Sequence, residues 1–251
     1  MKLFNRLADK LREISSNHGF TCDCCGVELF DYPRHRLCQN CLDMLWRNEG
    51  KRCEKCGRQT LSNGVCLDCK SCAPAFDKGF SPFVYRGKTA GLVNRIKNGE
   101  RRLAYFFAEQ ACEAFLRNMP VVTEGEPLLI LPVPTTETSL LERGYNQALE
   151  LALAMEKELK KQGVLVETDS SVLTKRRETK PQKHLHLFER AENVRGAFHV
   201  HKRTAVRDRT VLLIDDIMTT GATGSECARV LKNAGAKAVY FLVVACLPEL
   251  K

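Results

Sequence analysis

Residues 211–223 of this 251-residue chain read VLLIDDIMTTGAT, and this stretch decides the fold class. Residues 211–214 are an uninterrupted apolar run, which is typical of a β-strand that is buried on both faces of a parallel sheet. Two carboxylates, Asp215 and Asp216, follow the run. A threonine-rich loop then leads into an amphipathic stretch that we expect to be a helix over about residues 224–233. A strand, a polar loop and a helix in this order predict one βα unit of an α/β fold.

The loop after the strand has the composition of a phosphate site; its residues are Thr219, Thr220, Gly221, Ala222 and Thr223. Thr223 and Glu226 form a capping-box pattern, which predicts that the helix begins there. Backbone N–H groups at a helix N-terminus, threonine hydroxyls and small residues suit a phosphate monoester.

The adjacent carboxylates of Asp215 and Asp216 suit a pair of ribose hydroxyls or a divalent ion. A polar turn that only caps a helix would explain Thr223 and Gly221. It would not explain two acids where a parallel strand ends, which is where α/β sheets bind their ligands.

The rest of the C-terminal part repeats this alternation of apolar runs and amphipathic stretches from residue 128 onward. We expect strands at 128–131 and 239–244 and a helix at 147–159. The fold class is therefore α/β, with a mostly parallel sheet and helices on both faces.

Cysteine is concentrated at the start of the chain, where ten of the 13 cysteines lie in the first 72 residues. They include four successive Cys-x-x-Cys pairs, which are Cys22/Cys25, Cys38/Cys41, Cys53/Cys56 and Cys66/Cys69. Zn²⁺ binds four tetrahedral ligands, and a two-residue gap lets one turn aim two sulfurs at one ion. We therefore predict two structural zinc sites, from successive pairs or from a cross-braced arrangement. Cys24 and Cys72 are surplus, and redox dithiols or free thiols are the alternative interpretation.

Several further segments extend the pattern: Lys97 with Gly99, the run Leu131-Pro132-Val133-Pro134, the string Arg143-Gly144-Tyr145-Asn146-Gln147-Ala148, and Thr179-x-x-Gln182 followed by Arg190-x-x-Asn193. Residues 215–223 resemble the phosphoribosyl-pyrophosphate (PRPP) signature of type I phosphoribosyltransferases. Together with the cysteine-rich head, these segments resemble the successive blocks of the ComF family. Members of that family are competence proteins for natural DNA transformation, or close relatives of them.

Apolar residues at helical spacing predict an amphipathic helix in residues 1–20 that packs on its own domain, with a membrane surface or a partner as the alternative. For the chain after this helix, the resemblance implies a double zinc-ribbon-like head over 21–75 and a type I phosphoribosyltransferase-like domain over 76–251. Two positions depart from the family pattern. Thr135 stands where relatives often have a basic residue or His, and Gly224 stands where relatives usually have a large apolar residue.

The resemblance also implies roles for single residues in binding PRPP with Mg²⁺. Asp215 and Asp216 would hold the ribose 2′ and 3′ hydroxyls, and residues 219–223 would wrap the 5′-phosphate. Lys97, Thr135 and Arg143 would contact the pyrophosphate. No catalytic residue is assigned.

Positive charge is concentrated in residues 175–209, which carry 11 Lys and Arg residues against four acidic residues, or +7 of the chain's net charge of +9. Such a strip beside a phosphate site could track single-stranded DNA along its backbone, and its candidate contacts are Arg176, Arg177, Lys183 and Arg190. The alternative is a loop that closes over PRPP as a lid.

Two functions are compatible with these features. The first is a ComF-like, PRPP-binding protein that handles single-stranded DNA in competence, with a helicase or the DNA-uptake machinery as partner. The alternative is a Mg²⁺-dependent phosphoribosyltransferase that acts on a nucleobase or another small acceptor. We expect a cytoplasmic location, because no apolar run approaches the roughly 20 residues of a membrane span and no signal-peptide core is present.

Overall fold

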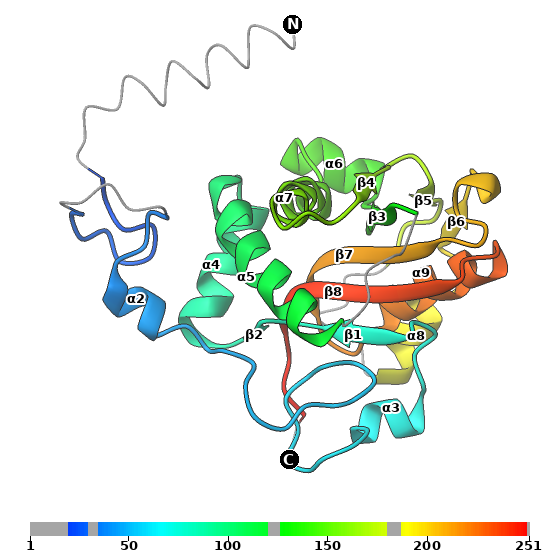
Figure 1. The fold of residues 1–251 in the computed structure, drawn as a ribbon, viewed down its shortest axis with the longest axis horizontal. Coiled ribbons are helices and arrows are strands. Elements are labelled where there is room, and N and C mark those ends of the chain that lie inside the picture. Colours follow the sequence, from blue (N-terminus) through cyan, green and yellow to red (C-terminus); the bar gives the residue numbers. More distant parts are fainter. Residues whose placement is uncertain (1–19, 30–34, 120–125, 180–186, 250–251) are drawn as a thin grey trace, which may run out of the picture. The chain divides into compact units, whose positions relative to one another are not determined.

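The computed structural model describes residues 20–29, 35–119, 126–179 and 187–249 (Figure 1). The helix predicted in residues 1–20 lies outside the described residues, apart from Phe20. The chain divides into two compact units, Met1–Leu45 and Trp46–Lys251. The cysteine-rich region expected over residues 21–75 is therefore shared between the two units. Within the described part of the chain, no helix combines the length and the apolar character needed to cross a membrane.

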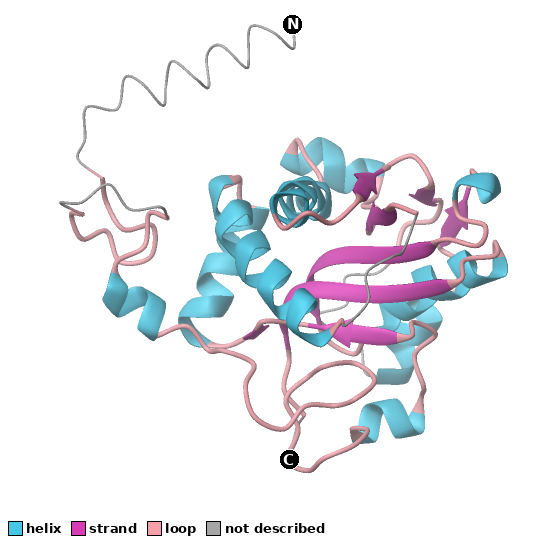
Figure 2. Ribbon diagram, in the orientation of Figure 1, coloured by secondary structure: helices cyan, strands magenta, loops and turns pink. Residues whose placement is uncertain are grey.

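The first unit has one described helix, α2 (Gln39–Asp43), which follows Cys38. Its other described residues form loops and turns, as Figure 2 shows by colour. A short antiparallel bridge joins Thr21 to Glu28 on either side of the first Cys-x-x-Cys turn.

The second unit is built on a parallel sheet with the strand order β1-β8-β7-β3-β4, and β2 also pairs with β8. Its strands are β1 (Lys78–Phe80), β2 (Phe83–Val84), β3 (Leu128–Pro132), β4 (Val166–Thr168), β7 (Thr210–Met218) and β8 (Ala238–Cys246). A separate antiparallel hairpin pairs β5 (Leu173–Lys175) with β6 (Phe198–Val200). The α/β class and the parallel sheet predicted from the sequence are confirmed.

Helices cover both faces of the sheet (Figure 1). Packed on one face are α4 (Gly87–Lys97), α5 (Arg102–Asn118) and α7 (Gln147–Lys161). On the other face lies α9 (Ala222–Asn233), and α8 (Leu187–Val194) packs against α9. The short helices of this unit are α3 (Leu67–Ser71), α6 (Glu137–Arg143) and the 3₁₀ turn η2 (Arg203–Ala205).

Side chains of β7 alternate between the two faces of the sheet, and apolar residues on both faces are buried. Val211 and Leu213 belong to the same buried cluster as Cys227 and Leu231 of α9. The intervening Leu212 is also fully buried, and it points to the opposite face because successive strand residues alternate. The predicted strands and the helix at 147–159 are all present, and each is longer in the structure than in the prediction.

The start of α9 differs from the prediction. The helix begins at Ala222, and its N-cap is Gly221, whose φ of +81° is a conformation that glycine adopts without strain. The carboxylate of Glu226 accepts hydrogen bonds from the Gly196 N–H (2.7 Å) and from Arg229. The capping-box prediction was therefore wrong, because a tertiary contact uses the Glu226 side chain instead.

Candidate functional site

The candidate site lies where β3 and β7 end side by side at the carboxyl edge of the sheet. The chain continues from β3 to β4 on one side and from β7 to β8 on the other, so these two strands flank a topological switch point. Pro132 pairs with Ile214, and the Val133 N–H donates to the Ile214 carbonyl at 2.9 Å. The turn after β3 therefore lies beside Asp215 and Asp216.

The acid pair is held by contacts inside the domain. Asp216 is only 4% exposed, and its Oδ2 lies 3.1 Å from Nζ of Lys97, at the last residue of α4. That oxygen accepts no well-directed hydrogen bond from any residue that the structure describes. Asp215 Oδ1 accepts from the Asp216 N–H at 2.9 Å. Burial, and then the neighbouring Asp216, raise the pKa of Asp215 well above its usual value. A ligand that donates hydrogen bonds or brings a cation would stabilise the charged pair.

Lys175, in the basic segment, ends β5, and its Nζ donates to Thr179 Oγ1 at 2.8 Å. Burial lowers its pKa, whereas the charges of Glu178, Cys227 and Asp215 act in the opposite direction.

The predicted phosphate loop is a tight turn between β7 and α9. Thr220 Oγ1 accepts from the Ala222 N–H at 3.3 Å, and the Ser225 N–H donates to the Gly221 carbonyl at 2.8 Å. The N-terminus of α9 therefore points at the loop, with its partial positive charge beside Thr219–Ala222. Thr223 lies in the first turn of α9 rather than in the loop.

The structure also explains Gly224, which departs from the family pattern. A Cβ at this position would lie 2.5 Å from Cε1 of Phe241 on β8. The Phe241 ring fills the space where a larger side chain would pack, and it lies 5.3 Å from the ring of Phe76. Glycine is needed here for close helix–sheet packing.

The three residues expected to contact pyrophosphate differ in their surroundings and in their exposure. Lys97 reaches the acid pair, as described above. Thr135 is half-buried in the turn that follows β3. Arg143 is exposed at the end of α6 and donates to Gln147 Oε1 at 3.3 Å.

Tyr145 and Asn146 connect the string at 143–148 to two neighbouring turns of the site. The Tyr145 hydroxyl accepts from the Gly99 N–H at 3.0 Å, which ties the string to the turn after Lys97. Asn146 caps α7 by accepting from the Ala148 N–H, and it donates to the Val133 carbonyl at 3.2 Å. These residues hold together the turns that carry Lys97 and Thr135.

The cysteines form two clusters of four, in the sequential pairing: Cys22, Cys25, Cys38 and Cys41 in the first, and Cys53, Cys56, Cys66 and Cys69 in the second. Within each cluster all sulfurs lie within 4.8 Å of one another. Zn–S bonds of about 2.3 Å place tetrahedral sulfurs about 3.8 Å apart. The Cys25–Cys38 and Cys56–Cys66 sulfur pairs are each separated by 3.7 Å. Both clusters therefore fit a tetrahedral metal ion.

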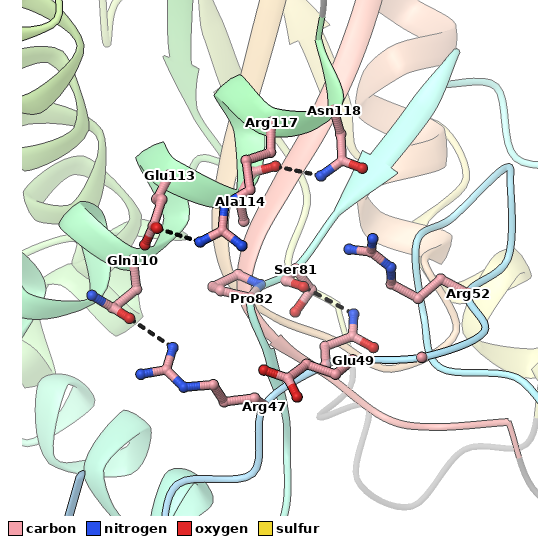
Figure 3. A pocket seen from close by; sticks show the side chains of 12 residues that line it. Arg47, Glu49, Arg52, Ser81, Pro82, Gln110, Glu113, Ala114, Arg117 and Asn118 are labelled. Atoms are coloured by element: carbon pink, nitrogen blue, oxygen red, sulfur yellow. Dashed lines mark hydrogen bonds and ion pairs between the residues drawn. The ribbon is translucent and has the colours of Figure 1, made fainter. Parts of the chain in front are cut away.

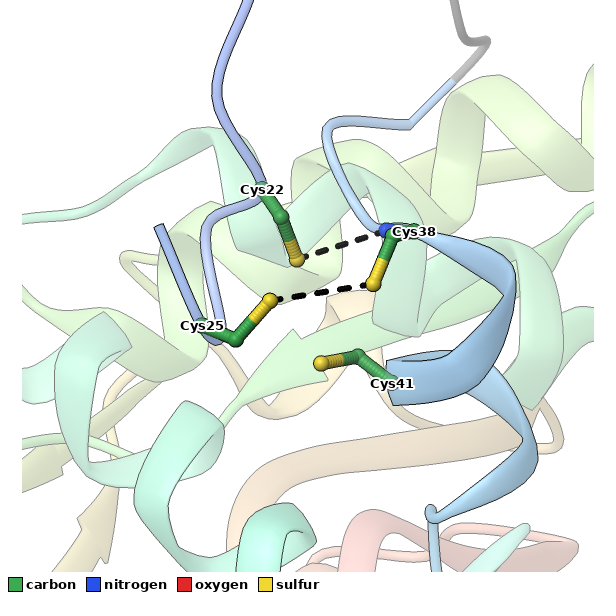
Figure 4. A group of neighbouring side chains, drawn as sticks. All are labelled: Cys22, Cys25, Cys38 and Cys41. Atoms are coloured by element: carbon green, nitrogen blue, oxygen red, sulfur yellow. Dashed lines mark hydrogen bonds between the residues drawn. The ribbon is translucent and has the colours of Figure 1, made fainter. Parts of the chain in front are cut away.

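Backbone N–H groups point at sulfurs in both clusters. The Cys38 N–H donates to Cys22 Sγ at 3.3 Å (Figure 4), and the Cys24 N–H donates to the same sulfur at 3.4 Å. Burial opposes ionisation of Cys22, but these donors outweigh it and lower its pKa to about 6. In the second cluster, a hydrogen bond from Cys69 lowers the pKa of Cys56 to about 5, against the effect of burial. Thiolates, which are the form that binds metal, are thus favoured at Cys22 and Cys56, whereas burial raises the pKa of Cys41 and Cys66 when no metal is bound.

The basic segment carries fewer free charges than its sequence suggests. Arg177 donates to the carbonyls of Asn193 and Arg195 at 2.8 and 3.0 Å, so its guanidinium closes a turn of the fold. Arg176 is exposed. Arg190 is half-buried on α8, and Lys183 lies outside the described residues.

A second basic place is a polar cavity of about 760 Å³ beside α5 (Figure 3). Arg47, Arg52 and Arg117 line it, together with two acids, Glu49 and Glu113. Arg117 pairs with Glu113, and Arg47 donates to Gln110 at 2.7 Å. No motif in the sequence connects these residues, because they come from two distant segments.

Comparisons with known proteins agree with this architecture. A phosphoribosyl transferase domain model matches residues 140–249. Competence protein ComFC of Bacillus subtilis (strain 168) is 24% identical over 210 residues, covering 81% of this chain and 80% of that protein. DNA utilization protein YhgH of Escherichia coli (strain K12) is 27% identical over 195 residues, covering 77% and 83%. Competence protein F of Haemophilus influenzae is 24% identical over 230 residues, covering 88% and 94%.

The chain is therefore a protein with a phosphoribosyl transferase domain and two four-cysteine clusters. Over most of its length it is similar to ComFC, competence protein F and YhgH, so the predicted resemblance to the ComF family is confirmed.

Proposed function

We propose that the chain binds PRPP with Mg²⁺ at the carboxyl ends of β3 and β7 and handles single-stranded DNA in natural transformation. The observation that carries the proposal is the acid pair near the end of β7, with Asp216 buried and Asp215 half-buried, followed by a tight loop at the N-terminus of α9. The names of the similar proteins, two competence proteins and a DNA utilization protein, support the DNA part.

In this proposal each element has one task. Asp215 and Asp216 accept hydrogen bonds from the ribose 2′ and 3′ hydroxyls, while Thr219–Thr223 surround the 5′-phosphate. The turn that carries Thr135 faces the pyrophosphate, and Lys97 balances the charge of Asp216. Mg²⁺ would neutralise pyrophosphate oxygens when PRPP is bound. Lys175 adds a positive charge on the side of Asp215.

Ligand-induced stabilisation tests the PRPP part. A ligand that binds only the native state stabilises it by about 2.7 kcal/mol at 100 times its Kd. We expect PRPP with Mg²⁺ to raise the unfolding temperature more than ribose 5-phosphate, pyrophosphate or inorganic phosphate does. Equal shifts with PRPP and with inorganic phosphate would mean that the loop binds anions without recognising the ribose. No shift with PRPP would contradict the assignment.

The salt dependence of binding tests the DNA part. Each phosphate of a single strand that a basic residue neutralises contributes a slope of about −0.7 to log affinity against log salt. We expect a flatter slope for Arg176→Ala/Lys183→Ala, measured by fluorescence anisotropy with an oligonucleotide. Arg177 is left unchanged in this variant because its guanidinium supports the fold.

The matched comparison is Arg52→Ala/Arg117→Ala at the polar cavity, which also removes two positive charges. A slope that changes only in this second variant would move the DNA contact to the cavity. If both variants keep the wild-type slope, the four substituted residues do not contact DNA, and Arg190 and the first cysteine cluster become the remaining candidates.

A further inference from the structure

Arg58 connects the second cysteine cluster to the phosphate loop. It lies between Cys56 and Cys66 in the sequence, and it is only 3% exposed. One terminal nitrogen donates to Asp68 Oδ2 at 2.6 Å, and the other donates to the Thr219 carbonyl at 2.8 Å. Neither contact is part of the proposed ligand contacts.

The backbone at Arg58 is fixed by the turn that precedes it, which carries Cys53, Cys56 and Gly57. Gly57 packs so tightly on β1 that a Cβ there would lie 2.4 Å from the Gly79 carbonyl oxygen. The Gly79 N–H donates to the Lys55 carbonyl at 2.8 Å, and Asn48 Nδ2 donates to the Gly57 carbonyl at 2.7 Å. The turn is thus anchored to the sheet. The four buried cysteines of the second cluster belong to the same core as residues of β7 and α9.

At the other end, Arg58 fixes the orientation of one peptide group. A peptide unit is planar and trans, so the carbonyl of Thr219 and the N–H of Thr220 point in opposite directions. Because Arg58 holds the Thr219 carbonyl on its own side, the Thr220 N–H points away from the cysteine cluster. In a phosphate loop, backbone N–H groups are the donors that a phosphate needs.

We propose that Arg58 is a positioning residue that makes ligand binding at the phosphate loop depend on metal in the second cysteine cluster. The inference rests on the proposed PRPP function. A bound Zn²⁺ would hold Cys53, Cys56, Cys66 and Cys69 together and so fix the turn that carries Arg58. Without metal, the turn and the Thr219 peptide lose this restraint. Thermodynamic linkage requires the converse effect, so PRPP must strengthen metal retention at this cluster.

The test measures zinc release at equilibrium in the full chain with and without PRPP. A chromophoric chelator at increasing concentrations reports how much of each ion has been released. Two zinc ions are expected, and PRPP should tighten the binding of one of them by about fivefold or more, the lower range of an allosteric coupling. In Cys22→Ser, which lacks the first site, the remaining ion should be the one that PRPP helps to retain.

Arg58→Met should abolish the effect of PRPP on zinc release. Arg209→Met is the matched control, because Arg209 likewise bridges a carboxylate, Glu167, and a backbone carbonyl, Pro127, but at the starts of β3 and β4. This control should keep the full effect. Zinc content and unfolding temperature, measured for both variants, show whether each is folded and loaded.

The outcomes separate the two proposals. If calorimetry shows PRPP binding to the wild type but PRPP changes the equilibrium release of neither ion, the coupling is wrong and the PRPP function stands. The same holds if folded, zinc-loaded Arg58→Met retains the PRPP effect. If PRPP does not bind the wild type at all, the proposed function fails, and the coupling fails with it.

Discussion

At the scale of single residues, we expect the Asp215 carboxyl group to lower the stability of the ligand-free protein and to strengthen ligand binding. Its raised pKa means that the folded, ligand-free protein disfavours the charged carboxylate. By linkage, the protein loses stability as pH rises from the usual Asp range through the raised pKa, because the unfolded state gives up its proton first. We therefore expect Asp215→Asn to raise the unfolding temperature of the ligand-free protein at neutral pH. The same variant should bind PRPP at least about tenfold more weakly, since it loses a charge-assisted hydrogen bond.

Asp216→Asn is the comparison for this prediction. Asp216 pairs with Lys97 at 3.1 Å, so its neutralisation leaves that amine without its partner and should bring no gain in stability. Thermal unfolding followed by circular dichroism measures both variants. A stability gain in Asp216→Asn but not in Asp215→Asn would reverse the roles assigned here.

The pH dependence of PRPP binding follows from the same carboxylate. In the proposed complex, ribose hydroxyls would donate to the ionised form of Asp215, whose pKa is raised without ligand, so binding should lower this pKa and release a proton. Affinity should therefore rise as pH rises through the raised pKa. Calorimetry in buffers with different ionisation enthalpies measures the released proton.

The phosphates of PRPP titrate in the same region, so Asp215→Asn is needed as the control for that measurement. The part of the proton release that belongs to Asp215 should disappear in this variant. Proton release that is identical in wild type and Asp215→Asn would show that PRPP binding does not change the ionisation of Asp215.

At the scale of elements, the contact between α9 and β8 depends on Gly224. An added Cβ would meet the Phe241 ring at 2.5 Å, and overpacking of this kind costs about 1–3 kcal/mol. We expect Gly224→Ala to lower the free energy of unfolding by this amount in urea titrations. Phe241→Leu in the same chain should recover part of the loss.

Gly91 in α4 provides the opposite case. No atom lies within 4 Å of a Cβ built at this position, and the residue is in a helix interior. Gly91→Ala should stabilise the protein by about 0.5–1 kcal/mol. If Gly224→Ala is also stabilising, helix propensity governs α9 and the contact with Phe241 is not tight.

Sequence reasoning predicted the elements better than their ends. Apolar runs such as residues 211–214 predicted the strands, because full burial requires apolar residues on both faces. The extension of β7 to Met218 and the start of α9 at Ala222 were missed. Both depend on partners elsewhere in the chain, namely β8 for the strand end and Gly196 for Glu226.

At the scale of the whole molecule, the two cysteine clusters belong to different compact units. The second cluster is part of the sheet unit's core, together with residues of β7 and α9. We expect elemental analysis of freshly prepared, reduced protein to find two zinc ions per chain. One ion or none would contradict the two-site proposal.

Loss of one ligand should affect the two clusters unequally. Metal binding supplies folding free energy where the ligands belong to a core. Cys53→Ser should therefore lower the unfolding temperature of the sheet unit strongly, whereas Cys22→Ser should leave that transition near the wild-type value. Equal effects on the sheet transition would mean that the first cluster also supports the sheet unit.

The candidate site shows the same limits of sequence reasoning as the elements. The acid pair and the loop are contiguous, so the sequence predicted them together. Arg58 and Tyr145 come from separate segments, and only the packing of the chain brings them to the phosphate loop and to the turn after Lys97. The residue types themselves do not indicate which groups these side chains contact.

The central claim is that PRPP binds at Asp215, Asp216 and the loop that follows. Calorimetric titration of PRPP with Mg²⁺ into the wild type and into Asp215→Ala/Asp216→Ala tests it most directly. The claim predicts saturable binding to the wild type at one site per chain. In the double variant, affinity should fall at least about tenfold, because the ribose diol loses its charged acceptors. Unchanged affinity in a folded double variant would contradict the claim.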